Sequence, residues 1–220
     1  PISRETRTIN AYGYQRGDLL GMPELCITIG MKQILAAAVA VATCGCSPDK
    51  PANPLLGDFD TPHGIAPFAQ ITIENYREGM LLGMEQQKAE IAAITESSEV
   101  PTFDNTILAL DQSGKLLRKV RGTFSPLSSS NSTEEMRALQ KEMSPLFSAH
   151  SDDIYLNDKL FARVKSVYES RGSLTLTPEQ AKILENIYKR FVNSGANLSE
   201  EQKARLRDLN KELSMLQLEF

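Results

Sequence analysis

Tryptophan is absent from this sequence of 220 residues, and cysteine is confined to its first quarter. The three cysteines are Cys26, Cys44 and Cys46. Everything after residue 46 must therefore fold without a disulfide and react without a thiolate. This excludes the folded part of the chain from the disulfide-stabilised small domains and from the cysteine hydrolases.

Histidine is also scarce, because only His63 and His150 occur. The chain contains no His-Glu-x-x-His zinc motif, no Gly-x-Ser-x-Gly, no P-loop and no Gly-x-Gly-x-x-Gly. The segment 193–197 (Asn-Ser-Gly-Ala-Asn) has the composition of a phosphate loop, but it follows a predicted helix instead of joining a strand to a helix. We therefore predict that it is a helix C-cap and turn.

His150 forms the one histidine–carboxylate cluster, with Asp152 and Asp153. A metal site would need further ligands at helical or hairpin spacing, and none follows nearby. We expect His150 to pack at a helix junction and one aspartate to accept backbone N–H groups. His63, between Pro62 and Gly64, is predicted to be an ordinary loop side chain. No residue of the chain is assigned a catalytic or metal-binding role.

Basic residues are not in excess. The chain has 24 lysines and arginines against 28 aspartates and glutamates, a net charge of −4 and a pI near 5.4. Nucleic-acid binding usually requires a basic face, so this composition argues against it. The charges are spread in mixed signs through the predicted helices, as expected for their solvated faces.

Helical periodicity is the strongest pattern present, and no convincing strand or internal repeat is found. We expect helices from Thr72 to about 98, from Thr102 to 124 with an interruption at Gly114, and from Ser132 to 146 with a kink at Pro145. The serine-rich segment 125–132 is predicted to be a mobile loop. The methionines Met80, Met84, Met136 and Met143 lie at core spacing.

The clearest helix signals lie in residues 157–220. Asn157 or Asp158 can cap a helix that Gly172 breaks, Thr177 opens the next with a capping box to Gln180, and Gly195 ends it. A third helix opens with Ser199 and has four leucines to bury: Leu206, Leu209, Leu213 and Leu216. The predicted fold class is all-α, an antiparallel multi-helix array.

The last predicted helix reaches Phe220 without a Gly, Asn or Pro stop signal. We therefore expect the sequence to be truncated within this helix. An apolar stripe without its packing partner should be exposed and should drive aggregation or dimerisation.

The first 57 residues have the pattern of a leader. Residues 1–30 have no period and are interpreted as an upstream extension, with Met31 as the true start. Residues 31–46 combine Lys32 with an apolar run of about ten residues, which is typical of a signal peptide and too short to span a bilayer. Residues 47–57, rich in proline, are predicted to be a tether to a helical domain at 58–220.

The end of the apolar run resembles a bacterial lipobox. Gly45 before Cys46 makes Cys46 the predicted lipidation site, with Cys44 as the runner-up. The alternative is an ordinary cleaved signal with incidental cysteines. Either way we expect an exported protein of the cell envelope, lipid-anchored to a bacterial membrane or periplasmic.

Several consecutive blocks of sequence resemble one family. SAHSDDIYLNDKLFARVKSVYESR, LTPEQAKILENIYKRFVNSGANLSEEQKARLRDLNKELSMLQLEF, VPTFDNTILALDQSGKLLRKVRGTF and the entry segment from Asn53 to Tyr76 look like the N-terminal helical region of bacterial peptidyl-dipeptidases (dipeptidyl carboxypeptidases). These are thimet-oligopeptidase-like zinc metallopeptidases, and the resemblance covers roughly residues 53–220.

This resemblance implies an incomplete domain of a clam-shaped enzyme that hydrolyses short peptides. The helices would form a wall or lid of the cleft, and the family's zinc motif lies downstream of the matched region. Zinc is therefore expected only in the full-length parent, together with the catalytic domain as partner, and this chain alone is expected to be inactive. The alternatives are a self-contained lipid-anchored helical binding module and an enzyme of other chemistry that uses His150.

Overall fold

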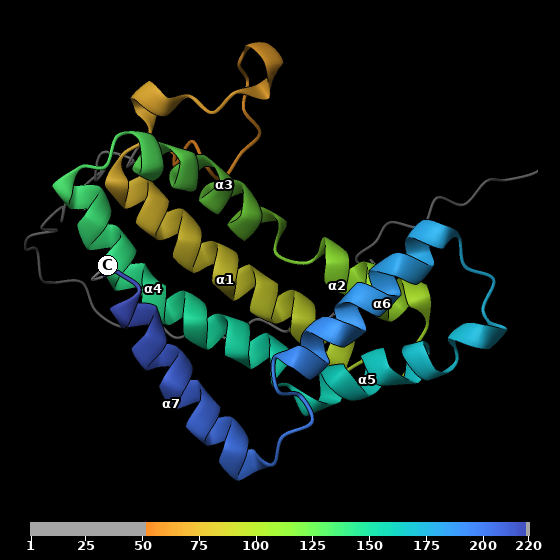
Figure 1. Ribbon diagram of the computed structural model, residues 1–220. Coiled ribbons are helices and arrows are strands. Elements are labelled where there is room, and N and C mark those ends of the chain that lie inside the picture. Colours follow the sequence, from red (N-terminus) through yellow and green to blue (C-terminus); the bar gives the residue numbers. More distant parts are fainter. Residues whose placement is uncertain (1–51, 219–220) are drawn as a thin grey trace, which may run out of the picture. The chain divides into compact units, whose positions relative to one another are not determined.

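The computed structural model describes residues 52–218. The predicted extension, signal peptide, lipidation site Cys46 and Phe220 lie outside the described residues. Within residues 52–218 every regular element is a helix, which confirms the all-α prediction (Figure 1). No helix in that range is both long enough and apolar enough to cross a membrane.

Helix α1 (Ile73–Thr95) is the longest element and lies between α3 (Lys115–Ser130) and α4 (Glu134–Tyr155). It begins at the predicted cap, where Thr72 Oγ1 accepts from the backbone N–H of Asn75 and Asn75 Oδ1 accepts from the backbone N–H of Thr72. Its buried side chains join those of α3 and α4 in one hydrophobic cluster: Tyr76, Met80, Met84, Leu117, Val120, Phe124, Met136, Leu139 and Met143.

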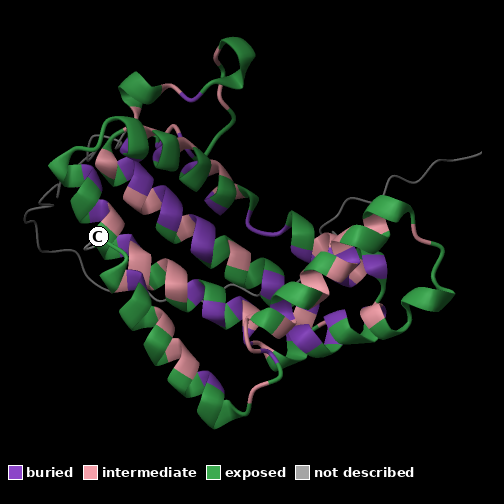
Figure 2. Ribbon diagram, viewed as in Figure 1, coloured by how far each residue is buried: buried purple, intermediate pink, exposed green. Residues whose placement is uncertain are grey.

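A second hydrophobic cluster surrounds the other end of α1. It contains the π-helical turn η3 (Phe103–Leu108), α2 (Ala109–Gln112), α5 (Asp158–Glu169) and α6 (Pro178–Asn193). Aromatic rings pack at its centre, with Phe161 stacked on Phe191 at 5.8 Å and Tyr155 edge-on to Phe191 at 5.1 Å. Figure 2 shows buried residues along α1 and α4 and where α5 and α6 face each other.

Helix α7 (Glu200–Leu216) packs along α4. Ser144 Oγ donates to the carbonyl of Ser214 at 2.9 Å, and Asn210 Nδ2 donates to Asp152 at 2.7 Å. Three leucines of the predicted stripe remain exposed to 44–52%: Leu209, Leu213 and Leu216. The predicted exposure of this stripe is thus confirmed for the chain as described.

Several predicted boundaries were wrong. Residues 125–130, predicted to be loop, continue α3 through Pro126 to Ser130, because the hydroxyls of Ser128, Ser129 and Ser130 donate to carbonyls one turn earlier. Thr133, not Ser132, caps α4, and α4 continues without a break past Pro145 to Tyr155.

The predicted tether also differs from the structure at its C-terminal end. Leu55 is completely buried in the first cluster, and Asn53 Nδ2 donates to the carbonyl of Asn75 at 2.9 Å. Residues 53–55 are therefore part of the packed domain. Short 3-10 turns cover Pro62–Gly64, Phe68–Gln70 and Arg171–Ser173, the last at the predicted break near Gly172.

Candidate functional site

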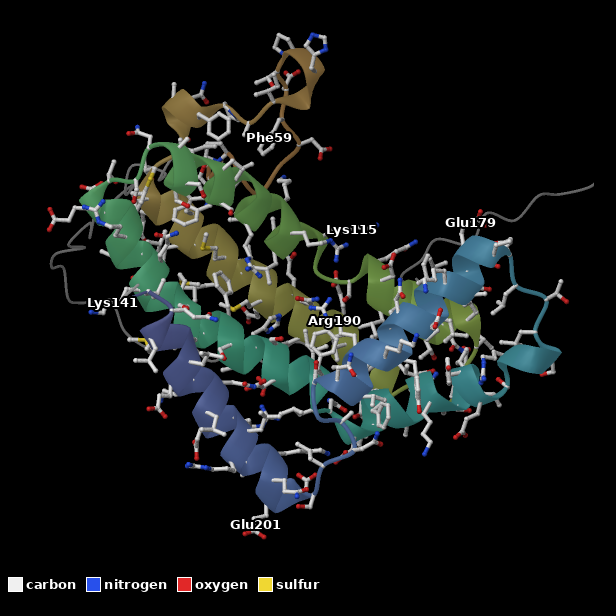
Figure 3. All side chains as sticks on the ribbon, in the orientation of Figure 1. Phe59, Lys115, Lys141, Glu179, Arg190 and Glu201 are labelled. Carbon is white, nitrogen blue, oxygen red and sulfur yellow. The ribbon has the colours of Figure 1, made fainter. Side chains whose placement is uncertain are left out.

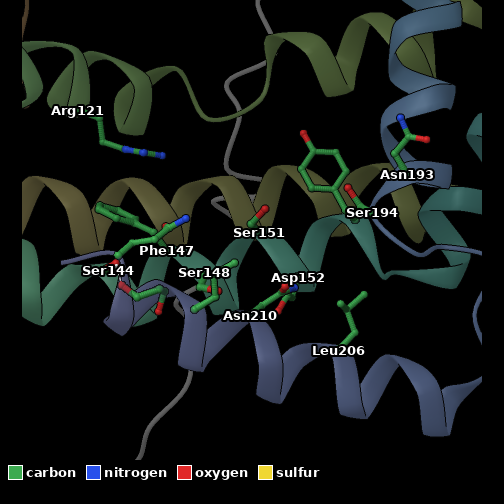
Figure 4. A pocket seen from close by; sticks show the side chains of 14 residues that line it. Arg121, Ser144, Phe147, Ser148, Ser151, Asp152, Asn193, Ser194, Leu206 and Asn210 are labelled. Carbon is green, nitrogen blue, oxygen red and sulfur yellow. Dashed lines mark hydrogen bonds between the residues drawn. The ribbon is translucent and has the colours of Figure 1, made fainter. Parts of the chain in front are cut away.

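Three adjoining pockets lie along one side of α4, and together we call them the α4 groove. The central pocket, of about 560 Å³, lies between α3, α4 and α6. The α7 pocket, of about 510 Å³, shares Arg121, Phe147, Ser151 and Tyr155 with it (Figure 4). The α6 pocket, of about 450 Å³, shares five lining residues with the central pocket: Gln87, Arg118, Ile154, Tyr155 and Arg190. Each volume is in the usual range for small-molecule and peptide sites.

The central pocket is basic. Arg190, which is labelled in Figure 3, lines it from α6, and Arg118 and Arg121 line it from α3. No aspartate or glutamate of residues 52–218 lines it. The guanidinium of Arg121 lies 4.5 Å from the ring centre of Phe147, and that of Arg190 lies 4.4 Å from that of Tyr155. Such stacking leaves the N–H groups at the edge of a guanidinium free to donate.

None of these three arginines has a carboxylate partner among residues 52–218. Two guanidinium nitrogens of Arg118 are already hydrogen-bonded to the backbone, because they donate to the carbonyls of Gln112 and Ser113. Of these three arginines, Arg121 and Arg190 therefore have the most free donors. An anion beside either guanidinium group would gain charge-assisted hydrogen bonds.

His150 lies in the wall of the central pocket, within α4 and not at the predicted helix junction. Its Nε2 lies 2.8 Å from Gln87 Oε1, Gln87 Nε2 donates to Ser113 Oγ at 3.2 Å, and Ser113 Oγ donates to the carbonyl of Leu110. Since the amide oxygen only accepts, the ring donates through Nε2. Burial, with Lys88 as the next cause, lowers the pKa of His150, so the ring is neutral near pH 7.

The two aspartates near His150 serve helix packing. Asp152 is buried and accepts from Asn210, and burial raises the pKa of its carboxyl. Asp153 pairs with Arg207 at 3.1 Å and with Lys88 at 3.4 Å. The prediction that an aspartate accepts backbone N–H groups was wrong, because the recorded partners of both carboxylates are side chains.

Zinc requires three or four converging ligands, and residues 52–218 contain no group of three His, Cys, Asp or Glu side chains that could hold a metal ion. The described residues therefore do not fit a catalytic zinc site. His63, the other histidine, is exposed in the turn Pro62–Gly64.

The segment 193–197 is the predicted C-cap. Gly195 has a φ of 95°. Its N–H donates to the carbonyl of Val192, and the N–H of Ala196 donates to the carbonyl of Phe191. The turn matters to the groove, because Asn193 and Ser194 line the α7 pocket.

The α4 groove was not predicted from the sequence. Its arginines come from two helices that are distant in the sequence, and mixed charges on amphipathic helices are ordinarily solvated. One pattern in the sequence does indicate part of the groove. Phe147, Ser151 and Tyr155 are four residues apart, so two aromatic rings and a hydroxyl lie on one face of α4.

No protein-family model matches the chain. Over 168 residues, 76% of its length, the chain is 40% identical to the dipeptidyl carboxypeptidases of Escherichia coli K12 and of Salmonella typhimurium LT2. Over the same length it is 27% identical to oligopeptidase A of Haemophilus influenzae. The chain spans about a quarter of each relative, 25% or 24%. These matches confirm the resemblance predicted from the sequence.

Proposed function

We propose that this chain is the N-terminal helical part of a peptidase related to the dipeptidyl carboxypeptidases, and that the whole protein hydrolyses short peptides. The observation that carries the proposal is the 40% identity over 168 residues, which make up 76% of the chain. Because the match covers a quarter of each relative, the activity is proposed for the whole protein and not for these residues alone.

We further propose that the helices form one wall of a substrate cleft, with the α4 groove facing it, and that the zinc centre lies elsewhere in the polypeptide. The absence of a three-ligand group among residues 52–218 supports the second point. A wall of this kind would hold a peptide and keep bulk water from it, while the hydrolytic groups come from the remainder of the protein.

A chimaera tests this proposal. Residues 53–218 would replace the matching quarter of the Escherichia coli dipeptidyl carboxypeptidase, and release of C-terminal dipeptides from blocked tetrapeptides would be measured. We expect the chimaera to be active and both the isolated 220-residue chain and the relative without its matching quarter to be inactive. A folded but inactive chimaera, or hydrolysis by the isolated chain, would contradict the proposal.

The proposed location of the zinc has its own test. Treatment of the chimaera with a chelator should abolish its activity, and added zinc should restore it. The helical content and unfolding midpoint of the isolated chain should not change under the same treatment. A chelator-induced loss of stability in the isolated chain would place a metal site within it.

We also propose that the protein is exported and lipidated at Cys46, on the basis of the sequence pattern at residues 31–46. Intact-mass measurement of the protein from bacterial membranes should give a mature form that starts at a lipidated Cys46. The Cys46→Ser variant should lose the lipid, whereas Cys44→Ser should keep it. A lipid at Cys44, or cleavage without any lipid, would overturn the assignment.

A further inference from the structure

We infer that the central pocket of the α4 groove binds the carboxylates of acidic peptides, with Arg121 and Arg190 each taking one. The choice of a peptide as ligand rests on the proposed function. The recognition of carboxylate rests on the geometry of the pocket itself.

The charge balance of the pocket favours an anion. Three arginines line it, and no acidic side chain of the part of the chain that the structure describes does so. The two aspartates of the α4 groove lie toward its ends, Asp152 in the α7 pocket and Asp111 in the α6 pocket. The positive charge is therefore concentrated in the middle of the groove, where burial of His150 in its neutral form adds no further charge.

Stacking on aromatic rings pre-organises the guanidinium groups of Arg121 and Arg190 for binding. Each lies over an aromatic ring of α4, which restricts its orientation and reduces the entropy lost when a ligand binds. A planar guanidinium held in this way can offer two parallel N–H groups to one carboxylate. Ser125 and Ser151 also line the pocket.

The spacing of the rings suggests the length of the ligand. Phe147 and Tyr155 are eight residues apart on α4, which is about 12 Å along the helix axis. An extended peptide advances about 3.3 Å per residue, so two carboxylates three or four residues apart would match the two arginines. A pocket of about 560 Å³ has room for such a short segment.

The experiment measures binding of a blocked peptide to the 220-residue chain by titration calorimetry. The probe is an acetylated and amidated heptapeptide of alanines with aspartate as its second and sixth residues, and the reference carries asparagine at both. We expect the aspartate peptide to bind at least about tenfold more tightly, since charged hydrogen bonds are about twice as strong as neutral ones. Equal affinities, or no detectable binding of the aspartate peptide, would overturn the inference.

Two pairs of variants separate the pocket from general electrostatic attraction. Arg121→Gln with Arg190→Gln should abolish the preference for aspartate. Lys141→Gln with Arg205→Gln removes the same charge from exposed positions outside the groove and should leave the preference intact. An equal loss in both pairs would show that only net charge matters, and the pocket assignment would fall.

The pocket variants are expected to fold, because both arginines are exposed. If circular dichroism shows unfolding, Arg121→Lys with Arg190→Lys carries the test. This pair keeps the charge but loses the planar fork, and we expect it to weaken binding several-fold. Unchanged binding by a folded lysine pair would contradict bidentate recognition.

The active chimaera distinguishes two sources of the carboxylate. If substrates supply it, the arginine-to-glutamine pair should raise KM for aspartate-containing substrates and leave kcat unchanged. If the remainder of the polypeptide supplies it, the aspartate heptapeptide should bind the 220-residue chain but not the chimaera, which would overturn the peptide assignment. An inactive chimaera would contradict the proposed function alone, because the heptapeptide measurement does not depend on catalysis.

Discussion

At the scale of single residues, Arg163 of α5 stabilises a chain connection that lies outside its own helix. This arginine of α5 is buried, and its Nη1 donates to the carbonyls of Ser97 and Glu99, both at 3.1 Å. Its Nη2 lies 3.4 Å from Asn105 Oδ1. The side chain thus satisfies backbone groups in the connection between α1 and η3, which has no regular hydrogen bonding of its own.

Replacing Arg163 with methionine should therefore be costly. The variant keeps an apolar stem but leaves the two carbonyls without their charged donor, and such bonds contribute about 1.5–3 kcal/mol. We expect urea unfolding to show a loss of about 2 kcal/mol in the free energy of unfolding. Arg205→Met, at an exposed position of α7, should change it by less than about 0.5 kcal/mol. Equal effects of the two substitutions would show that Arg163 does not hold this connection.

His150 makes the stability of the domain depend on pH. Burial lowers its pKa below the ordinary value of 6.5, so the unfolded chain takes up a proton at a pH where the folded chain does not. The contribution of the neutral ring is complete above about pH 6.5 and is lost as the pH falls from there toward the lowered pKa. Asp152 contributes a pH dependence of stability with the opposite sign. Burial raises the pKa of its carboxyl, so protonation favours the folded state.

Comparison with His150→Gln isolates this contribution. The difference in free energy of unfolding between the wild type and the variant should shrink as the pH is lowered from 7.5 to 5.5, by about 1.4 kcal/mol for each unit of pKa shift at most. Because Asp152 is present in both proteins, its effect cancels. A difference that is constant over this range would contradict a buried neutral histidine.

At the scale of helices, α1 and α3 approach closely at two glycines. A Cβ atom on Gly83 would lie 2.9 Å from both the N and the Cα of Leu117, whereas one on Gly79 would lie 3.0 Å from a methyl group of Val120. A side-chain methyl can move but backbone atoms can move only with their helix. Gly83 is therefore the residue that sets the distance between α1 and α3.

Gly83→Ala tests this close contact. Overpacking typically costs about 1–3 kcal/mol and alanine returns up to about 1 kcal/mol of helix propensity, so we expect a net loss of about 1–2 kcal/mol in unfolding free energy. Gly122→Ala on α3 is the matched control, because no atom lies within 4 Å of its added Cβ. It should stabilise the domain by about 0.5–1 kcal/mol. A stabilising Gly83→Ala would contradict the proposed contact.

Local signals predicted the helix starts well and the helix ends less well. The caps at Thr72, Thr102, Asn157, Thr177 and Ser199 could be recognised because the capping chemistry is contained in four successive residues. The serine-rich end of α3 was mispredicted because the same hydroxyls favour loops when exposed and bond to the preceding turn when a helix is packed. Ser128 is buried and Leu127 packs against the cluster that contains Met136, and the sequence does not show this.

At the scale of the whole domain, burial patterns were predictable but the groove was not. Periodicity placed Met80, Met84, Met136 and Met143 in the core, and all four are buried, because each helix must turn its apolar stripe inward. The groove depends on how α3, α4, α6 and α7 are placed against one another, and no local pattern specifies this. The clearest example is Arg190, whose ring partner Tyr155 belongs to another helix.

The exposed leucine face of α7 should make the 220-residue chain self-associate. Leu209, Leu213 and Leu216 form one stripe at i, i+4 and i+7, and contiguous apolar surface of this kind usually marks an interface. We expect sedimentation velocity to show concentration-dependent association, and Leu209→Glu with Leu213→Glu to abolish it without loss of helical content. Monomeric behaviour of the wild type at all concentrations would contradict this expectation.

Proline 145 divides α4 between the two hydrophobic clusters. Met136, Leu139 and Met143 before it belong to the cluster with α3, whereas Ile154 after it belongs to the cluster with α5 and α6. Proline has no amide hydrogen, so one hydrogen bond of the helix is missing between the two halves. Amide hydrogen exchange should therefore report two levels of protection along a single continuous helix. The central pocket lies beside the later half of α4. Local opening of that half would therefore be coupled to ligand binding.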